Sequence, residues 1–416
     1  MISNLSLVKN IKQILLCNDK PVPFLKGQAM SILPELKDAY IIIEDDCIHS
    51  FGPNNNIPDL HYDKIVDADH GFVFPSFVDS HTHLVFAAWR ETEFMDRING
   101  LSYEQISQRG GGILNSAKKI AEIDEDELFD ISLKKLNKVI SHGTGAIEIK
   151  SGYGLSTESE IKMLKVIQRL KKVSPITIKS TFLGAHSFPL EYRNNQDGYV
   201  DLIVNEMLPE IAKQNLADYC DVFCERNFFS IEQSKTILLA AQKLGMQSRI
   251  HTNQFTHSGG IALATEINTI SVDHLEELND SEIDQLQNSK IIPCLLPGAA
   301  FFMNCSFPPA LKMLDKNLGF SIASDFNPGT CPIWNMNTIF QLSVIKMRLN
   351  TQQALAGLTV NGAYALGIED QQGSIFPNAL ANLIITKQIS SLDYIPYAVN
   401  DDCIAKIIIK GLEIKR

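Results

Sequence analysis

The sequence has no uninterrupted apolar stretch of the ~18 residues that a membrane-spanning helix needs. Residues 11–16 form only a short apolar run, and the charged Lys9 and Lys12 flank or interrupt it, so no signal peptide is expected. Basic residues are also in deficit, because 37 Lys and Arg stand against 48 Asp and Glu, a formal net charge of −11. This balance argues for solubility and against nucleic-acid or anionic-membrane binding.

No Cys-x-x-Cys pair occurs among the eight cysteines, which are scattered along the chain. In a chain of 416 residues they indicate reduced core thiols of a cytoplasmic protein and not a disulfide framework. With 45% hydrophobic and 20% charged residues, the chain can bury a large core. Its length allows one large barrel with an appendage, or two to three ordinary domains.

Both ends of the chain have β character, whereas short apolar strands alternate with amphipathic helices in between. Eight strands are expected at residues 73–80, 145–151, 176–185, 219–224, 247–252, 269–273, 291–296 and 320–324. This alternation predicts an α/β fold, a parallel (β/α)8 barrel of the TIM type over residues 71–370. Residues 1–70 and 371–416 are expected to form one small β-sandwich domain from both termini.

The connection after the first barrel strand is unusually long and runs over residues 84–143. Its Gly110, Gly111 and Gly112 indicate a flexible point. Because loops at the active face of a barrel carry function, we expect substrate contacts from this segment.

The stretch FVDSHTHLVFAAWR at residues 77–90 contains His81 and His83, two positions apart after an apolar run. Residues two apart on a strand point to the same face, so both imidazoles project together. Imidazole is a favoured ligand of zinc and iron, and this pair therefore forms half of a candidate metal site.

The remaining candidates follow the later strands, at the barrel end where active sites lie. His186, His251 and His274 fall at the ends of the third, fifth and sixth strands, and Asp325 follows the eighth. Five of the ten histidines thus lie on the predicted active face, which random placement would rarely produce.

His81, His83, His251 and Asp325 make a suitable ligand set for one Zn or Fe ion, with a position left for water. Such an ion lowers the pKa of bound water from 15.7 to roughly 7 and polarises a carbonyl. Asp325 is placed to orient that water or to take its proton, and His274 to stabilise an oxyanion or relay a proton. Lys150 could suggest a carbamylated bridge to a second metal, but its position in the second strand is wrong for that role. One metal ion per chain is therefore predicted.

Several stretches together resemble the metal-dependent amidohydrolase superfamily, and within it the imidazolonepropionases of histidine degradation. They are HTHLVF at 81–86 with Arg90, RGGGI at 109–113, EIKSGYGL at 148–155, GAH at 184–186, DVFCE at 221–225, LLPG at 295–298 and SDFNPG at 324–329. The resemblance covers nearly the whole chain. It implies a (β/α)8 barrel with a small β-sandwich, and hydrolysis of 4-imidazolone-5-propanoate to N-formimidoyl-L-glutamate by metal-bound hydroxide attacking the cyclic amide carbonyl.

The resemblance also implies roles for individual residues. Metal ligands are implied at His81, His83, His251 and Asp325, and substrate contacts at Arg90, Tyr153, His186, Gln254, Asn327, Gly329 and Thr330. Arg90 offers a bidentate fork for the propanoate carboxylate. The chain departs from many members of the family at Gln254, where they carry Glu. A Gln side chain can hydrogen-bond the ring but cannot act as an acid or base, so the proton transfers fall to Asp325 and His274.

Two other function classes stay open. A cyclic deaminase of the same superfamily would act on an aminated ring, but a neutral base has no carboxylate to pair with Arg90. A non-catalytic barrel scaffold is the other, and the intact ligand set argues against it. The expected partner is a small molecule with a carboxylate, and we consider a homodimer as the oligomeric state.

Overall fold

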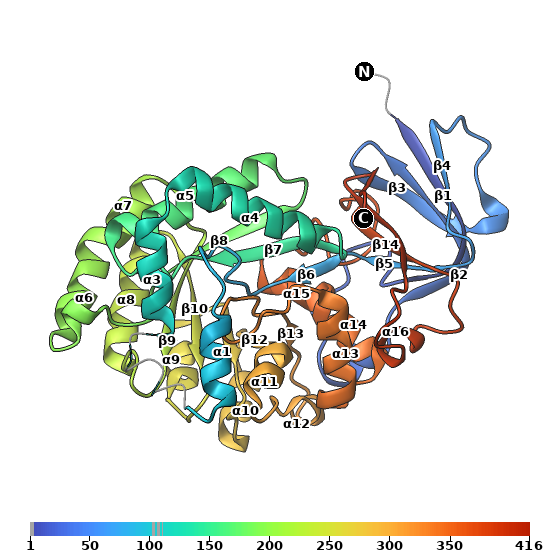
Figure 1. The fold of residues 1–416 in the computed structure, drawn as a ribbon. Helices are drawn as coiled ribbons and strands as arrows, with labels where there is room; N and C mark the ends of the chain where they lie inside the picture. Colours follow the sequence, from blue (N-terminus) through green and yellow to red (C-terminus); the bar gives the residue numbers. More distant parts are fainter. Residues whose placement is uncertain (1–3, 102–104, 106–108, 110) are drawn as a thin grey trace.

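The computed structural model describes residues 4–101, 105, 109 and 111–416. Figure 1 shows a large barrel surrounded by helices and a smaller β region beside it, where both labelled chain ends lie. The expected fold class is confirmed: a parallel (β/α)8 barrel with a separate sheet built from both termini.

Eight parallel strands make the barrel and follow one another in chain order from β6 to β13. They are β6 (Phe77–Asp79), β7 (Thr144–Lys150), β8 (Thr177–Ala185), β9 (Tyr219–Cys224), β10 (Gln247–Thr252), β11 (Ser271–His274), β12 (Ile292–Leu295) and β13 (Ser321–Ile322). All eight lie within or close to the ranges expected from the sequence. Their carboxyl ends therefore meet on one face of the barrel.

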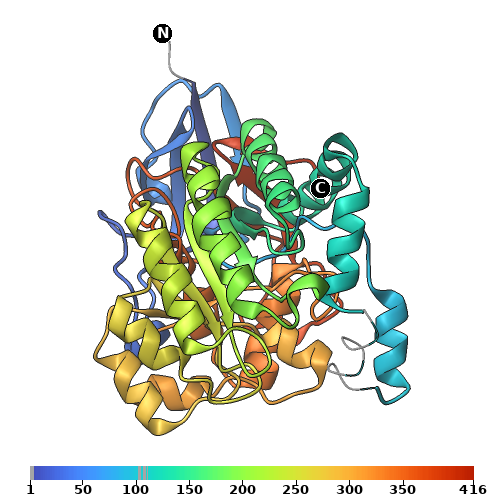
Figure 2. The ribbon, with the colours of Figure 1, turned by 90° about the vertical axis from the view of Figure 1, so that its left-hand side faces the viewer.

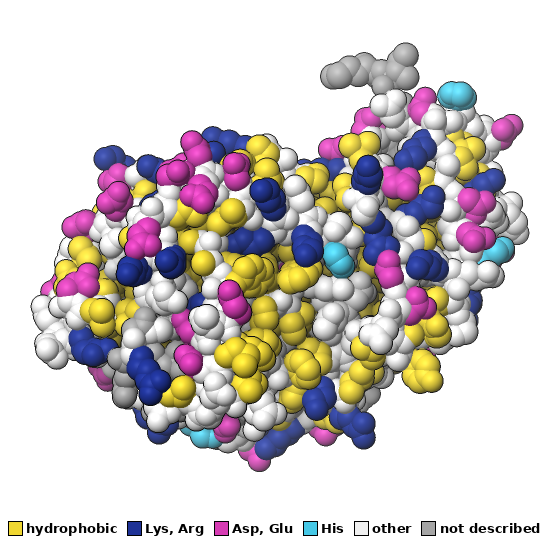
Figure 3. Space-filling view, in the orientation of Figure 1, with side chains coloured by type: hydrophobic (Ala, Val, Ile, Leu, Met, Phe, Trp, Pro, Cys, Tyr) yellow, Lys and Arg dark blue, Asp and Glu magenta, His cyan; other side chains and the backbone are white. Residues whose placement is uncertain are grey.

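Helices cover the outside of these strands, and Figure 2 shows several of them side by side around the barrel. They are α1 (Glu91–Ile98), α3 (Ile113–Glu122), α4 (Glu125–Ile140), α5 (Thr157–Val173), α6 (Gln196–Leu202), α7 (Leu208–Lys213), α8 (Ile231–Lys243), α9 (Gly260–Ile267), α10 (Asp280–Gln287), α11 (Pro297–Met303), α12 (Ala310–Asp315), α13 (Met336–Met347), α14 (Thr351–Leu358), α15 (Val360–Ala365) and α16 (Tyr394–Tyr397). Among the described residues, every helix is too short or too polar to cross a bilayer. Acidic and basic side chains are interspersed over the face seen in Figure 3.

The barrel closes between its first and last strands through a few hydrogen bonds around the site. The backbone N–H of Asp325 donates to the carbonyl of His81 at 3.0 Å, and that of His83 donates to Phe326 at 2.8 Å. Just below, the carboxyl of Asp79 accepts from the backbone N–H of Ser324 at 2.9 Å and from its hydroxyl at 2.6 Å. The hydrogen bonds that close the barrel therefore also fix the backbone positions of His81, His83 and Asp325.

The small sheet combines strands from both ends of the chain in the order β16-β15-β14-β5-β1-β2-β3, with β4 on β1. They are β1 (Leu5–Leu15), β2 (Glu35–Glu44), β3 (Cys47–Pro53), β4 (Lys64–Asp67), β5 (Phe72–Pro75), β14 (Leu383–Thr386), β15 (Ile404–Ile409) and β16 (Leu412–Glu413). The antiparallel pairing of β14 with β5 joins the C-terminal strands to the N-terminal ones. A separate apolar cluster, which includes Val8, Ile41 and Leu383, fills its core.

The prediction of a single strand at residues 73–80 is wrong, because the structure divides this stretch into two strands, β5 and β6. β5 pairs with β1 and β14 of the small sheet, whereas β6 pairs with β7 of the barrel. Every residue of both strands is buried, so the apolar run gives no sign that its partners change. Residues 72–75 therefore belong to the small sheet, although the expected barrel domain began at residue 71. Of the predicted flexible point at Gly110, Gly111 and Gly112, Gly110 lies outside the described residues, while Gly112 is the N-cap of α3 with φ of 73°.

The closure predicts a specific cost for Ser324→Ala. This change removes the hydroxyl donor to buried Asp79 and the acceptor that Ser324 offers to the backbone N–H of Phe326. The free energy of unfolding should fall by roughly 1–3 kcal/mol, the range for a buried polar group that loses its partner. Thermal unfolding of the metal-free protein measures this.

Ser271→Ala is the matched control. Ser271 is also fully buried, but its hydroxyl has no hydrogen-bond partner within the described chain. Its removal should leave stability nearly unchanged. Equal unfolding midpoints for the two variants would contradict the closing role of Ser324.

Candidate active site

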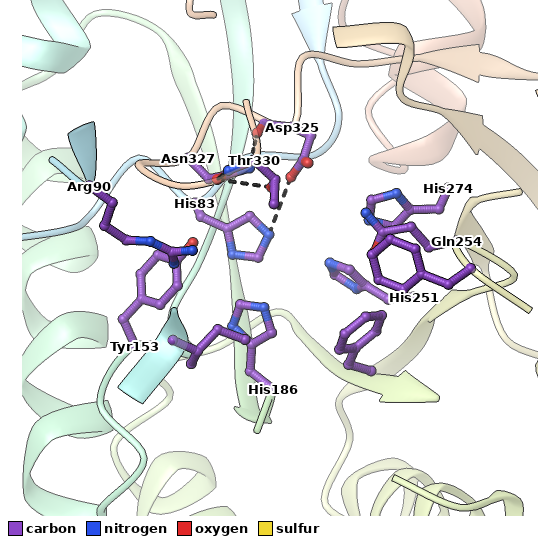
Figure 4. Close-up of a pocket in the computed structure, with 13 residues that line it drawn as sticks. His83, Arg90, Tyr153, His186, His251, Gln254, His274, Asp325, Asn327 and Thr330 are labelled. Carbon is purple, nitrogen blue, oxygen red and sulfur yellow. Dashed lines mark hydrogen bonds and ion pairs between the residues drawn. The ribbon is translucent and has the colours of Figure 1, made fainter. Parts of the chain in front are cut away.

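Three imidazoles converge at the carboxyl ends of β6 and β10. Ligand nitrogens of His81, His83 and His251 lie within 4.8 Å of one another, and all three residues are buried. Asp325, which follows β13, brings Oδ1 to 3.6 Å from Nε2 of His81 and 3.5 Å from Nε2 of His83. Figure 4 shows His83, His251 and Asp325 around the same cavity. The structure thus brings together all four residues expected to bind a metal.

The state of these imidazoles fits a metal ion. Nε2 of His81 and Nε2 of His251 are buried and have no hydrogen-bond partner among the described residues. Burial, reinforced by neighbouring positive groups such as Lys150, lowers the pKa of His81 and His83 well below the ordinary value. Both rings are therefore neutral near pH 7 and offer lone pairs, which is what a Zn or Fe ion requires.

Two carboxylates behind the imidazoles fix their orientation. Asp273 Oδ2 lies 2.7 Å from Nδ1 of His81, and Asp221 Oδ2 lies 2.9 Å from Nδ1 of His251. A carboxylate on Nδ1 holds the proton there and turns the lone pair of Nε2 toward the centre. Sequence reasoning gave Asp221 and Asp273 no role, although Asp221 stands in a stretch that carries the family resemblance and Asp273 directly precedes His274.

Lys150 lies between these carboxylates and is fully buried. Its Nζ is 2.7 Å from Oε1 of Glu148, 2.8 Å from Oδ2 of Asp221 and 3.8 Å from Oδ2 of Asp273. Burial alone would lower the pKa of Lys150, but Asp221 and Glu148 raise it above the ordinary value, so the ammonium stays charged. Its contacts are those of a structural cation.

The cavity in front of the imidazoles contains nearly all of the predicted substrate contacts. It is lined by His83, Arg90, Ile113, Tyr153, His186, Phe223, His251, Gln254, Phe255, His274, Asp325, Asn327 and Thr330. Gly329 is the exception, because it lines an adjacent apolar groove with Trp89 and Phe94. Sequence reasoning gave no role to the apolar walls Ile113, Phe223 and Phe255, although the first two lie in stretches that carry the family resemblance.

Two of the predicted contacts have defined hydrogen-bonding states. Nδ1 of His186 donates to the carbonyl of Gly152 at 2.9 Å, which leaves Nε2 as an acceptor. Burial lowers the pKa of His186 to about 3, so the ring stays neutral. The amide of Asn327 is engaged within its own loop, because Oδ1 accepts from the backbone N–H of Thr330 at 2.7 Å and Nδ2 donates to the carbonyl of Asp325 at 2.6 Å.

The two residues expected to move protons have unusual backbones and raised pKa values. His274 has φ of 89° and Asp325 has φ of 54°, a region that costs non-glycine residues about 1–3 kcal/mol. Burial raises the pKa of Asp325 to about 7. Burial opposes a charge on His274, but Glu276, with Oε1 at 3.3 Å from Nδ1, raises its pKa above the ordinary value. Glu276 was not anticipated from the sequence.

Comparison with known proteins identifies the family. A sequence model of the amidohydrolase family matches residues 229–414. The imidazolonepropionase of Flavobacterium johnsoniae is 46% identical over 98% of this chain and 99% of its own length. That of Clostridium tetani is 38% identical over 97% of each chain. The chain belongs to the imidazolonepropionase family.

Solved structures with the same fold lie further away. An adenosine deaminase from Xanthomonas campestris with bound zinc has a TM-score of 0.70 at 15% identity, over 98% of this chain and 92% of that one. A guanine deaminase from C. acetobutylicum has a TM-score of 0.69 at 17% identity, over 99% of this chain and 100% of that one. At such low identity these likenesses establish the fold alone.

The contact between Asp273 and His81 predicts weaker metal binding for Asp273→Asn. The amide cannot fix the ring as the carboxylate does, so the affinity for Zn²⁺ should fall about 10–100-fold. Competition with a chelator measures the dissociation constant. Asp218→Asn, the same change beside Lys171 at the opposite end of the barrel, should leave it unaltered. Equal affinities for the two variants would remove Asp273 from the support of the metal centre.

Proposed function

We propose that this protein hydrolyses 4-imidazolone-5-propanoate to N-formimidoyl-L-glutamate in histidine degradation. The observation that carries the proposal is a single cavity, in a chain of the imidazolonepropionase family, that holds both the imidazole–carboxylate cluster and the guanidinium of Arg90. The substrate is a small molecule with a carboxylate. A homodimer, and the absence of nucleic-acid and membrane partners, stay predictions.

The metal centre we propose holds one Zn or Fe ion on His81, His83, His251 and Asp325. When bound, the ion supplies Lewis acidity, which polarises the amide carbonyl and lowers the pKa of water. The count of one is supported by Lys150, whose ammonium already lies among the carboxylates behind the imidazoles.

Recognition of the substrate carboxylate is assigned to the side of the cavity away from His274. Arg90 and Tyr153 lie on one side of the cavity in Figure 4, and His274 and Gln254 lie on the other. Arg90 pairs with the propanoate, while Nε2 of His186 accepts a hydrogen bond from the ring and Gln254 and Tyr153 contact its edge. Thr330 contacts the product, while Asn327 and Gly329 act by shaping the loop that lies against Arg90.

The proton transfers are assigned to Asp325 and His274. The attacking water must lose a proton and a ring nitrogen must gain one. Asp325, whose pKa is raised to about 7 by burial, can accept and hold a proton near neutral pH. His274, whose pKa the nearby Glu276 keeps raised despite burial, can donate a hydrogen bond to the developing oxyanion.

An ultraviolet assay for loss of the imidazolone, joined to elemental analysis, tests this function. We expect turnover and about one Zn or Fe per active chain. Ammonia release from an aminated purine or pyrimidine, with no imidazolone turnover, would favour a deaminase. Protein that is purified without metal and stays inactive when Zn²⁺ or Fe²⁺ is added would favour a scaffold.

His274→Ala should retain the metal but lose roughly 10²–10⁴-fold in kcat, the usual range for an acid–base group. Steady-state kinetics and metal analysis of the same preparation measure both quantities. His257→Ala is the control, because His257 is half exposed and pairs with Glu282 outside the cavity. Near-normal turnover by a fully metallated His274→Ala enzyme would place the proton relay elsewhere, with His186 as the next candidate.

A further inference from the structure

Arg90 is held at one edge of its guanidinium and open at the other. It is the N-cap of α1 and only 7% exposed, and it lines the cavity. Its Nε donates to Oε2 of Glu93 at 2.9 Å. Its two terminal nitrogens donate to no group in the described part of the chain. A bidentate fork toward a carboxylate needs this arrangement, with both donors available and the plane of the group fixed.

The carboxylate of Glu93 is itself held by hydrogen bonds from the start of α3. Its Oε2 also accepts from the backbone N–H of Gly112 at 3.0 Å, and its Oε1 accepts from Nδ2 of Asn115 at 3.0 Å. Gly112 is the N-cap of α3 and Asn115 lies in its first turn, so these two hydrogen bonds link Glu93 of α1 to the start of α3. The carboxylate is 8% exposed and is satisfied at both oxygens, so it has a single rotamer to offer Arg90.

Gly329 forms the wall on the second side of Arg90. A Cβ on Gly329 would lie 2.2 Å from one terminal nitrogen of Arg90 and 2.3 Å from its central carbon. The guanidinium therefore packs against the backbone of Gly329. Glu93 fixes the Nε edge and Gly329 blocks one face, which leaves the terminal edge for a ligand.

We propose that Glu93 is a positioning residue that makes the site selective for carboxylate-bearing substrates by holding the guanidinium of Arg90 in its forked orientation. This inference rests on the proposed function. Glu93 touches no substrate. The Glu93 carboxylate also offsets the positive charge of the Arg90 guanidinium. Selectivity for a carboxylate therefore comes from two directed hydrogen bonds and depends on their geometry.

The test compares two substrates in the metal-loaded full chain. One is 4-imidazolone-5-propanoate, and the other is its amide, in which a neutral carboxamide replaces the propanoate carboxylate. In Glu93→Ala we expect KM for the acid to rise at least 10-fold with a smaller change in kcat, because the lost interaction is equal in ground and transition states. KM for the amide should stay within about twofold of the wild type, because the neutral carboxamide makes no ion pair with Arg90.

Three further variants calibrate the result. Glu93→Gln keeps an acceptor for Nε without the charge and should lie between wild type and Glu93→Ala, and it decides the question if Glu93→Ala does not fold. Arg90→Lys removes the fork itself and should show the full loss of selectivity for the acid. The loss in Glu93→Ala should come close to it. Glu91→Gln makes the same chemical change at an exposed position of α1 and should leave both substrates unaffected.

The outcomes separate the inference from the function on which it rests. Equal losses on acid and amide, or no loss on either, would overturn the role of Glu93 while leaving the hydrolase function intact. Turnover of neither compound by the metallated wild type would overturn the proposed function and the inference with it. A loss confined to the acid, with unchanged metal content, supports both.

Discussion

The buried ion network behind the imidazoles is the constraint on which the site depends. Glu148, Asp221 and Asp273 share the ammonium of Lys150, and the guanidinium of Arg249 lies 3.5 Å from Asp273. All five side chains are fully buried. An isolated ion costs several kcal/mol to bury, so no member of this network is stable without the others. Three carboxylates against two cations leave one negative charge, which favours a cation on the imidazole side.

Through this network, the positions of the barrel strands set the positions of the imidazole side chains. Lys150 ends β7, Asp221 lies in β9 and Asp273 in β11, so the network ties together strands that are not neighbours. Asp273 and Asp221 in turn contact the Nδ1 atoms of His81 and His251 and so orient the two rings. The barrel closes at the same level, where the backbones of residues 81–83 and 325–326 are hydrogen-bonded. The imidazole cluster is therefore built on the ends of hydrogen-bonded barrel strands.

The residues proposed to recognise the substrate have a different structural origin. Arg90 and Glu93 come from the long connection after β6, and Asn327 and Gly329 from the loop after β13. The two segments meet where Arg97 donates to the carbonyl of Gly329 at 2.9 Å and where the Trp89 ring lies against Phe326. A barrel can change such loops without disturbing the strands that hold the ion network.

The sequence alone determined the strand–helix alternation and the residues at strand ends, because periodicity and the His-x-His spacing are local signals. From them the barrel and the grouping of His81, His83, His251 and Asp325 could be predicted. Only the tertiary structure decided that β5 leaves the barrel for the small sheet, since both sheets bury an identical kind of apolar run. It also decided the partners of Lys150, because Glu148 is two residues away but Asp221 and Asp273 are brought close only by strand pairing. The Arg90–Glu93 spacing was visible in the sequence, yet its meaning depends on Gly112, Asn115 and Gly329, which converge on it only in the folded chain.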